Sequence, residues 1–333
     1  MAQPAAPFAH PLRSAPWRLG AGALAVALAS GLWGCAAPPM GPAVAPGAAV
    51  ASQRLDPTPR IAVISAFEPE LAVLLPQVQQ ARTHSLHGVT FTTGTLEGQP
   101  VVVFLSGISM TNAAMNTQRV LDHFHVTHIV YSGIAGGVNP GLRIGDVAVP
   151  AQWGQYMEWL MAREDKPGHH TAPDWMKAEL TWPAFGMMHP RPVEVRSATH
   201  PGVRRQFWFP ADPRMLDVAR GLHTVDLAHC HASQCLSQRP RLVVGGNGVS
   251  GQAFVDHKAF REYAFNTFQA NVLDMETAAT AMVAHSNGVP YIAFRSLSDL
   301  AGGGEGENEM GTFMHLAATN SAKVVQAFLA AWK

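Results

Sequence analysis

Residues 271–302, NVLDMETAATAMVAHSNGVPYIAFRSLSDLAG, carry the clearest signal in the chain. Apolar residues recur with helical spacing over residues 274–287, and a glycine follows where the helix is expected to end. Residues 291–296 (YIAFRS) then form the short apolar run that is typical of a buried strand. This stretch therefore places one acid, Glu276, on a helix and a second acid, Asp299, just after a strand.

The alternation of short apolar runs and helical patterns extends over residues 60–333 and predicts an α/β fold. Further strands are expected at residues 61–65, 89–96, 101–105, 127–132, 143–150 and 241–249, and further helices at residues 66–78, 111–124 and 313–332. The strands at 89–96 and 101–105 are expected to form a hairpin. Residues 151–240 are less regular and rich in Trp, His and Pro, which indicates an elaboration of the domain.

The N-terminal residues predict export. Residues 19–32 (LGAGALAVALASGL) follow two arginines, are too short to span a bilayer, and fit a signal peptide over residues 1–35. Its last residues, Leu-Trp-Gly-Cys, resemble a bacterial lipobox, which implies lipidation at Cys35 and a membrane-anchored lipoprotein in the periplasm, with the outer membrane as a candidate location. A signal peptide without lipidation and an uncleaved anchor are the alternatives. Residues 36–59, rich in Ala, Pro and Gly, are expected to be a flexible tether.

Charge and cysteine content limit the partners. Lys plus Arg and Asp plus Glu both total 23, so no broad basic surface for nucleic acid is expected. In an oxidising compartment, Cys230 and Cys235 are expected to form a disulfide. The alternative is a metal site that includes His229 and His231, although the spacing matches no common zinc motif. Neither a metal nor a cofactor is expected.

Three predicted strand ends carry candidate ligand-binding residues. Glu68 and Glu70 follow residues 61–65, residues 133–137 (GIAGG) form an expected glycine turn after residues 127–132, and Asp299 follows the strand of the opening stretch. Ligands of open α/β sheets bind beyond the carboxyl ends of strands, so these segments are expected to meet at one crevice. The glycine turn is neither GxGxxG nor a P-loop, so it predicts no dinucleotide or ATP site.

Several segments together resemble the nucleoside phosphorylase/nucleosidase superfamily, and most closely its methylthioadenosine/S-adenosylhomocysteine nucleosidases. They are AVISAFEPELAVLL, FTTGTLEGQPVVVFLSGI, IVYSGIAGGVNPGLRIGDVAVP, GNGVSGQAFV and DMETAATAMVAHSNGVPYIAFRSLSD. The resemblance implies a three-layer sandwich with a central mixed, partly barrel-like β-sheet flanked by helices. The middle region is also similar to plant bark storage proteins of this superfamily, some of which are mainly storage proteins, so fold alone does not establish activity.

The resemblance also implies roles for individual residues. Asp299 matches the general acid that protonates purine N7, and Glu70 matches the residue that activates the attacking water. Glu276 matches the acid that accepts hydrogen bonds from the ribose hydroxyls. The remaining substrate-binding candidates are Met275 against the ribose, Phe254 and Val255 against the base, Gly136, Ile134 and Ala135 in the glycine segment, and Ser298 and Arg295 as supports of the Asp299 loop.

Water is favoured over phosphate as the nucleophile. Phosphorylases of the superfamily resemble one another in an Arg and a Ser around the central glycine segment, and this chain has Tyr131 and Ile134 there. The expected reaction is hydrolysis of a purine nucleoside to base and pentose, by a homodimer in which a second subunit completes the 5′ pocket. The alternatives are a phosphorylase that recruits arginines such as Arg204 and Arg205 or those of a neighbouring subunit, and a non-catalytic nucleoside-binding or storage-like lipoprotein.

Overall fold

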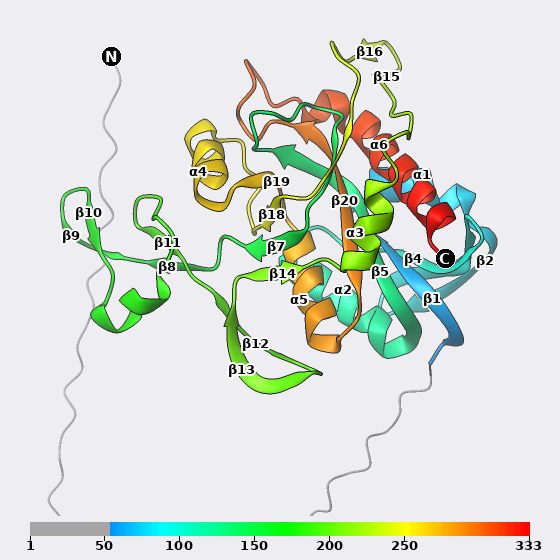
Figure 1. The fold of residues 1–333 in the computed structure, drawn as a ribbon, viewed down its shortest axis with the longest axis horizontal. Helices are drawn as coiled ribbons and strands as arrows, with labels where there is room; N and C mark the ends of the chain where they lie inside the picture. The colour runs from blue at the N-terminus through cyan, green and yellow to red at the C-terminus, as the bar shows by residue number, and fades with distance from the viewer. Residues whose placement is uncertain (1–53) are drawn as a thin grey trace, which may run out of the picture. The chain divides into compact units, whose positions relative to one another are not determined.

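A twelve-stranded mixed sheet organises residues 54–333, which are the residues described by the computed structural model (Figure 1). Its strands are β1 Asp56–Ser65, β2 Gln79–Leu86, β3 Val89–Leu96, β4 Gln99–Leu105, β5 Phe124–Gly137, β6 Val147–Val149, β7 Gln152–Gln155, β14 Trp208–Pro210, β17 Leu242–Val244, β18 Asn247–Ser250, β19 Ala270–Asp274 and β20 Tyr291–Asp299. The helices are α1 Glu68–Leu74, α2 Met110–His123, α3 Pro213–Arg220, α4 Lys258–Phe268, α5 Thr277–Asn287 and α6 Met310–Ala331, with short 3₁₀ turns at η1 Leu75–Gln77 and η2 Asp174–Glu179. The predicted signal peptide, Cys35 and most of the tether lie outside the described residues.

The centre of the sheet is parallel and buried on both faces. The main path runs β14-β7-β18-β19-β5-β1-β4-β3-β2, and β20 pairs with β5 and β6 off this path. Strands β1, β5 and β20 are mutually aligned, with Ile64 opposite Tyr131 and Tyr131 opposite Ala293. Their continuous apolar runs are those expected of strands covered on both sides. The α/β class with a central mixed sheet flanked by helices is thus confirmed.

Helices cover both faces of this sheet. Successive side chains of a strand point to opposite faces. On β20, the Phe294 ring packs against Phe328 of α6, with ring centroids 5.2 Å apart, whereas Arg295 donates a hydrogen bond to Thr277 at the start of α5. Helix α6 and the N-terminus of α5 therefore lie on opposite faces, and α2 packs beside α5. No helix among residues 54–333 is long and apolar enough to cross a membrane.

The glycine segment at residues 133–137 is the main error of the sequence analysis. It is not a turn but the last part of β5, where Gly133 pairs with Arg295 and Gly136 with Asp299 of β20. The glycines allow close packing rather than chain reversal, since a Cβ on Gly137 would lie 2.4 Å from the Leu297 side chain. The backbone at the end of strand β5 therefore extends into the crevice.

Other boundaries also differ from those predicted. Residues 56–59, assigned to the tether, belong to β1, because Asp56 and Pro59 pair with β5. Strand β20 continues through Asp299, so this acid ends the strand instead of following it. Helix α5 begins at Thr277, which places Glu276 at its N-cap. The predicted hairpin is confirmed as β3 and β4, whereas β2, α4 and β19 were not predicted.

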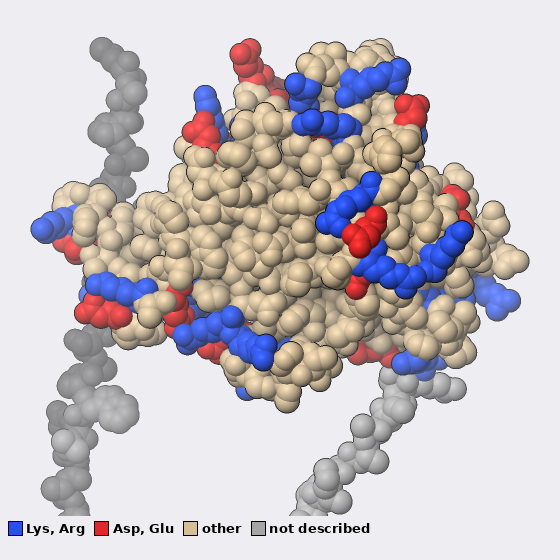
Figure 2. All heavy atoms as spheres, viewed as in Figure 1, with Lys and Arg blue, Asp and Glu red and all other residues tan. Residues whose placement is uncertain are grey.

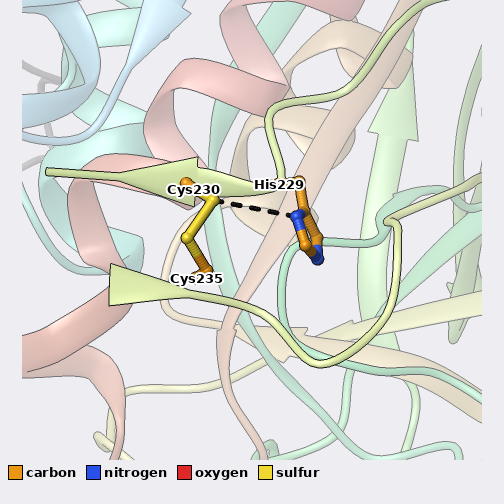
Figure 3. Close-up of a disulfide and its surroundings, with 3 residues drawn as sticks. All are labelled: His229, Cys230 and Cys235. Atoms are coloured by element: carbon orange, nitrogen blue, oxygen red, sulfur yellow. Dashed lines mark hydrogen bonds between the residues drawn. A yellow bond between two sulfur atoms is a disulfide. The ribbon is translucent and has the colours of Figure 1, made fainter. Parts of the chain in front are cut away.

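Residues 151–240 add two strands to the main sheet and four small two-stranded ribbons. The ribbons pair β8 Trp159–Met161 with β11 Met188–Pro190, β9 Arg163–Lys166 with β10 His169–Thr171, β12 Val193–Ser197 with β13 His200–Gln206, and β15 Cys230–His231 with β16 Gln234–Cys235. The predicted disulfide is confirmed, because Cys230 and Cys235 join β15 to β16 (Figure 3). The disulfide uses both of the thiols that the metal alternative requires, and His229 Nδ1 lies 3.7 Å from Cys230 Sγ.

Candidate active site

A cleft lies at the carboxyl ends of β1, β5, β19 and β20, and its volume, with the open solvent at its mouth included, is about 630 Å³. It is lined by Ala66, Phe67, Glu70, Ile108, Ile134, Ala135, Gly136, Ala253, Phe254, Val255, Leu273, Asp274, Met275, Glu276, Ser298, Asp299 and Met310. The three strand ends expected to converge therefore do so. Four of the lining residues are carboxylic acids, and this lining contains no Lys, Arg or His.

Glu70 is fixed by backbone donors from two strand ends. Because it is the third residue of α1, its side chain folds back over the helix start, where Oε2 accepts hydrogen bonds from the N–H groups of Ala66 (2.6 Å) and Phe67 (3.4 Å). Its Oε1 accepts a hydrogen bond from the N–H of Ile134 at 2.8 Å. Burial raises the pKa of Glu70, although Arg295 and the backbone donors act in the opposite direction. A buried carboxylate with a raised pKa is suited to accept a proton near neutral pH.

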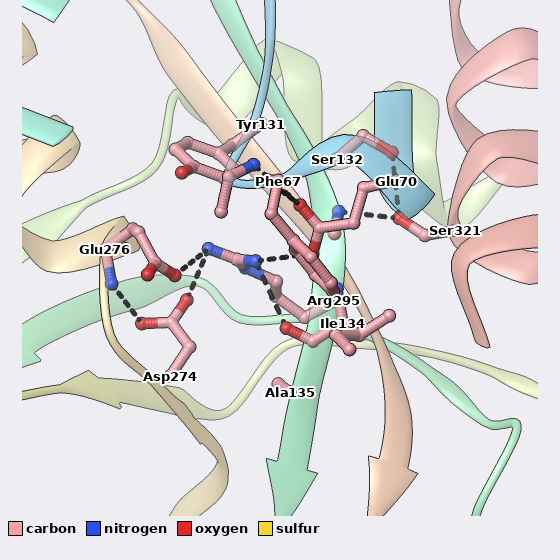
Figure 4. Close-up of polar contacts among 12 residues, drawn as sticks. Phe67, Glu70, Tyr131, Ser132, Ile134, Ala135, Asp274, Glu276, Arg295 and Ser321 are labelled. Atoms are coloured by element: carbon pink, nitrogen blue, oxygen red, sulfur yellow. Dashed lines mark hydrogen bonds and ion pairs between the residues drawn. The ribbon is translucent and has the colours of Figure 1, made fainter. Parts of the chain in front are cut away.

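Glu276 lies at the start of α5, on the other side of the cleft (Figure 4). Its Oε1 accepts a hydrogen bond from the N–H of Ser109 at 3.0 Å, and its Oε2 lies 3.4 Å from Nη2 of Arg295. Burial raises the pKa of Glu276 to about 7, with contributions from the negative charges of Asp274 and Glu70. The carboxyl group of Glu276 therefore changes its charge close to neutral pH.

Arg295 lies beneath the cleft and connects its acids (Figure 4). Arg295 was predicted to bind the substrate and to support the Asp299 loop. The structure corrects this, because Arg295 has no exposed surface and contacts other acids. Its Nη2 lies 2.7 Å from Oδ2 of Asp274, and its Nη1 lies 3.7 Å from Oε1 of Glu70. Its guanidinium also covers the ring of Tyr131, with 4.4 Å from Cζ to the ring centroid.

Gly133 leaves room for these charged groups. A Cβ atom at this position would lie 2.2 Å from Nη1 of Arg295 and 2.5 Å from Oε1 of Glu70. Both separations are shorter than any tolerable contact, so a side chain here would displace the acid or the guanidinium. The N–H of Gly133 is held in turn by the hydroxyl of Ser321 on α6, at 3.0 Å. Glycine at residue 133 is therefore a requirement of the site.

Asp299, the last residue of β20, also lines the cleft. Its Oδ1 accepts a hydrogen bond from the N–H of Ala301 at 2.8 Å, and its Oδ2 accepts one from the hydroxyl of Ser298 at 2.8 Å. The amide of Asn308 lies 3.5 Å from Oδ1. Burial raises the pKa of Asp299, with these hydrogen bonds acting in the opposite direction. Ser298 thus supports Asp299 as expected, and the carboxyl group is placed to hold a proton for a ligand in the cleft.

The predicted apolar contact residues line the cleft. These are Met275, Phe254, Val255, Ile134, Ala135 and Gly136. The Phe254 ring is 55% exposed and therefore free to lie against a ligand. Glu70, rather than Glu68, is the acid in the cleft, since Glu68 is exposed to solvent.

Seven lining residues were not predicted, namely Ala66, Phe67, Ile108, Ala253, Leu273, Asp274 and Met310. Asp274 could have been identified because it ends an apolar run, NVLD, although the helical pattern of residues 274–287 concealed that strand. Ile108 follows β4, a neighbour of β1 in the same sheet, so the rule that ligands bind at strand ends applies to it as well.

Comparison with known proteins agrees with this geometry. The family model of the phosphorylase superfamily matches residues 60–330. Among curated proteins, the 5′-methylthioadenosine/S-adenosylhomocysteine nucleosidase of Tolumonas auensis is 29% identical over 272 residues, which is 81% of this chain and 98% of that protein. The nucleosidase of the same name from Anoxybacillus flavithermus is 28% identical, over 80% of this chain and 96% of its own length.

Solved structures show the same fold. The 5′-methylthioadenosine/S-adenosylhomocysteine nucleosidase of S. pneumoniae, with a transition-state inhibitor, superposes with a TM-score of 0.61 at 25% identity, covering 82% of this chain and all of that one. The futalosine hydrolase of Helicobacter pylori superposes with a TM-score of 0.59 at 21% identity, covering 81% of this chain and 96% of that one.

Proposed function

This chain belongs to the phosphorylase superfamily, and we propose that its cleft hydrolyses the N-glycosidic bond of an adenosine-like purine nucleoside. The observation that carries the proposal is the cleft lining, in which four acids occur without a basic residue among the described residues. The curated relatives described above are named as nucleosidases that act on methylthioadenosine and S-adenosylhomocysteine. The products would be a free purine base and a free pentose.

Departure of the base is assigned to Asp299. Cleavage of the bond between C1′ and N9 leaves its electron pair on the purine, and a proton on N7 makes the purine a better leaving group. Burial raises the pKa of Asp299, which favours the protonated form that a general acid needs. The exposed ring of Phe254 and the side chain of Val255 would contact the base at this end of the cleft.

Glu276 is assigned to the sugar, and Glu70 is assigned to the water. Positive charge develops on the sugar ring as the base departs, and the carboxylate of Glu276 would stabilise it while accepting hydrogen bonds from the ribose hydroxyls. The oxygen of a water molecule would then bond to C1′ as Glu70 accepts its proton. Glu70 is held by backbone donors from both sides, so its position is fixed before a ligand binds.

Phosphate is a poor fit to this cleft. A phosphate dianion needs cationic or N–H donors, whereas the position next to the sugar presents Glu70 and Glu276. Arg295 does not provide a free cation, because it is buried beneath the cleft and paired with three carboxyl groups. Tyr131 has no exposed surface, and Ile134 offers an apolar side chain. These features favour water as the nucleophile.

Asp299→Asn tests the assignment of the general acid. The asparagine keeps the size of the side chain and can still accept the Ala301 hydrogen bond, but it has no proton to give. We expect the turnover of methylthioadenosine to fall on the order of 100- to 10,000-fold, with the affinity for a non-hydrolysable adenosine analogue retained, as measured by adenine release and by calorimetry. Unchanged turnover would remove Asp299 from the mechanism, and wild-type binding without any turnover would favour a binding protein instead.

We propose in addition that the protein is a homodimer that pairs through the groove between α2 and α5. The groove is lined by Met110, Thr111, Ala114, Met115, Gln118, Gln155, Ala279, Met282, Val283 and Ser286. Met115 is 47% exposed there, and Ile108, which lines the cleft, lies two residues before Met110 in the chain. A second copy in this groove would therefore cover an apolar surface next to the substrate site.

Met115→Glu is expected to dissociate such a dimer, because it places two charges in a self-complementary apolar interface. The molar mass measured by analytical ultracentrifugation should fall to that of one chain. Met161→Glu is the matched control, since Met161 is also exposed, at 57% against 47% for Met115, but lies outside the groove. A monomeric wild type, or a Met115→Glu variant that remains dimeric, would refute this interface.

We also propose that the protein is exported and anchored to a membrane through lipidated Cys35.

The proposed ligand is a small-molecule nucleoside, and no nucleic-acid partner is proposed. On the face shown in Figure 2, basic and acidic side chains are interspersed, and a wide area between them carries neither. Such a face offers no continuous basic track for a phosphate backbone.

Cys35→Ser tests the anchor. In a bacterial host, the wild type should sediment with membranes and the variant should remain in the soluble fraction, because serine cannot form the thioether to lipid. Sedimentation of the variant with membranes to the same extent would contradict lipidation at Cys35.

A further inference from the structure

Asp274 is a buried acid to which the proposed reaction assigns no step. Its Oδ1 accepts hydrogen bonds at 3.2 Å from the N–H groups of both Glu276 and Thr277, and one from the hydroxyl of Ser250. Its Oδ2 accepts a hydrogen bond from the hydroxyl of Thr277 and lies 2.7 Å from Nη2 of Arg295. Both oxygens of this carboxylate therefore face protein donors.

Its position makes it the primary partner of the buried guanidinium. Arg295 faces three carboxyl groups, at 2.7 Å for Asp274, 3.4 Å for Glu276 and 3.7 Å for Glu70. The side chains of Arg295 and Asp274 are only 1% and 2% exposed, so their attraction is weakly screened. One positive charge cannot fully neutralise three negative charges. The electrostatic attraction is strongest for the nearest carboxylate, which is that of Asp274.

We propose that Asp274 is a positioning residue of the site, which holds Arg295 beneath the cleft and thereby limits the positive charge that Glu276 receives. The effect of Asp274 on catalysis rests on the proposed hydrolysis, whereas its contacts with Arg295 and Glu276 do not depend on that proposal. Asp274 also fixes the direction of Glu276, because it binds the backbone N–H of that residue and of the next one.

The charged groups around Glu276 support the proposal that Asp274 limits the influence of Arg295 on Glu276. Arg295 on β20, Asp274 on β19, Glu70 on α1 and the hydroxyl of Tyr131 on β5 face it from the surrounding elements. The pKa of Glu276 is raised to about 7, and burial is the largest cause; Arg295 opposes this shift, whereas Asp274 and Glu70 contribute to it. An acid that is poised in this way loses its proton as the pH rises through about 7, and the ionised form is the one that stabilises a cationic sugar.

Asp274→Asn separates the charge of this residue from its hydrogen bonds. The amide oxygen can still accept the two N–H donors, whereas Arg295 is left with Glu276 and Glu70 as its charged partners. We expect the titration midpoint of Glu276 to move down by about one pH unit. Carbon-13 NMR of protein labelled at the glutamate carboxyl groups measures this directly, with the signal assigned by Glu276→Gln.

Thr277→Val is the matched control. It removes the hydroxyl that contacts both Asp274 and Arg295, but it removes no charge. We expect this variant to be less stable while its Glu276 midpoint stays within a few tenths of a unit of the wild type. An equal shift in both variants, or no shift in Asp274→Asn, would overturn the proposal.

The wild-type titration keeps the proposal testable even if Asp274→Asn does not fold. A midpoint near that of an ordinary glutamate, about 4.3, would overturn it. The measurement needs no turnover, so its outcome is independent of the proposed reaction. If the protein hydrolyses nucleosides, the pH at which kcat/KM reaches half of its plateau on the acidic side should move down with the NMR midpoint in Asp274→Asn and stay in place in Thr277→Val.

Discussion

A single buried cation holds the catalytic end of this protein together. The guanidinium of Arg295 is fully removed from solvent, and a charge in that position is tolerated only where opposite charges and hydrogen-bond acceptors surround it. The acids that meet this requirement come from α1, β19 and the N-cap of α5. Glu70 is thereby drawn to the same point beneath the cleft as Asp274 and Glu276, which lie far from it in the sequence.

The same burial prepares the acids for chemistry. Removing carboxylates from water raises the pKa of Glu70, Glu276 and Asp299, since the charged form loses its hydration. The three acids nevertheless differ in their neighbours. Glu70 and Glu276 lie near Arg295, whereas Asp299 is supported by Ser298, Ala301 and Asn308 without that cation. This difference allows one acid to keep a proton while another accepts one, as a reaction with both an acid and a base requires.

Local pattern was sufficient for the class of fold and for three of the four acids of the cleft. Buried parallel strands are recognised in a sequence as apolar runs, and Glu70 and Asp299 follow or end such runs. The rule that ligands bind at strand ends therefore predicted that these two acids lie in one site. The sequence similarity to nucleosidases then supplied their roles. These predictions depend on neighbours in the sequence and on general rules of sheet topology.

What could not be predicted depends on long-range contacts. Residues 133–137 looked like a turn because glycine favours turns, but glycine stands at residue 133 because Arg295 and Glu70 occupy the space of its Cβ. The role of Arg295 was misassigned, since its partners lie on β19, α5 and α1 and none is its neighbour in the sequence. Asp274 was missed because the helical pattern of residues 274–287 concealed the end of β19, and its partner Arg295 lies on another strand.

The most direct test of the account is the release of adenine from methylthioadenosine by the purified protein in buffer stripped of phosphate. A cleft that presents acids and no basic residue to its ligand should release adenine at a rate that added phosphate does not change, and the second product should be the free 5-methylthio sugar. Release that starts only when phosphate is added, with a sugar 1-phosphate as the second product, would contradict it.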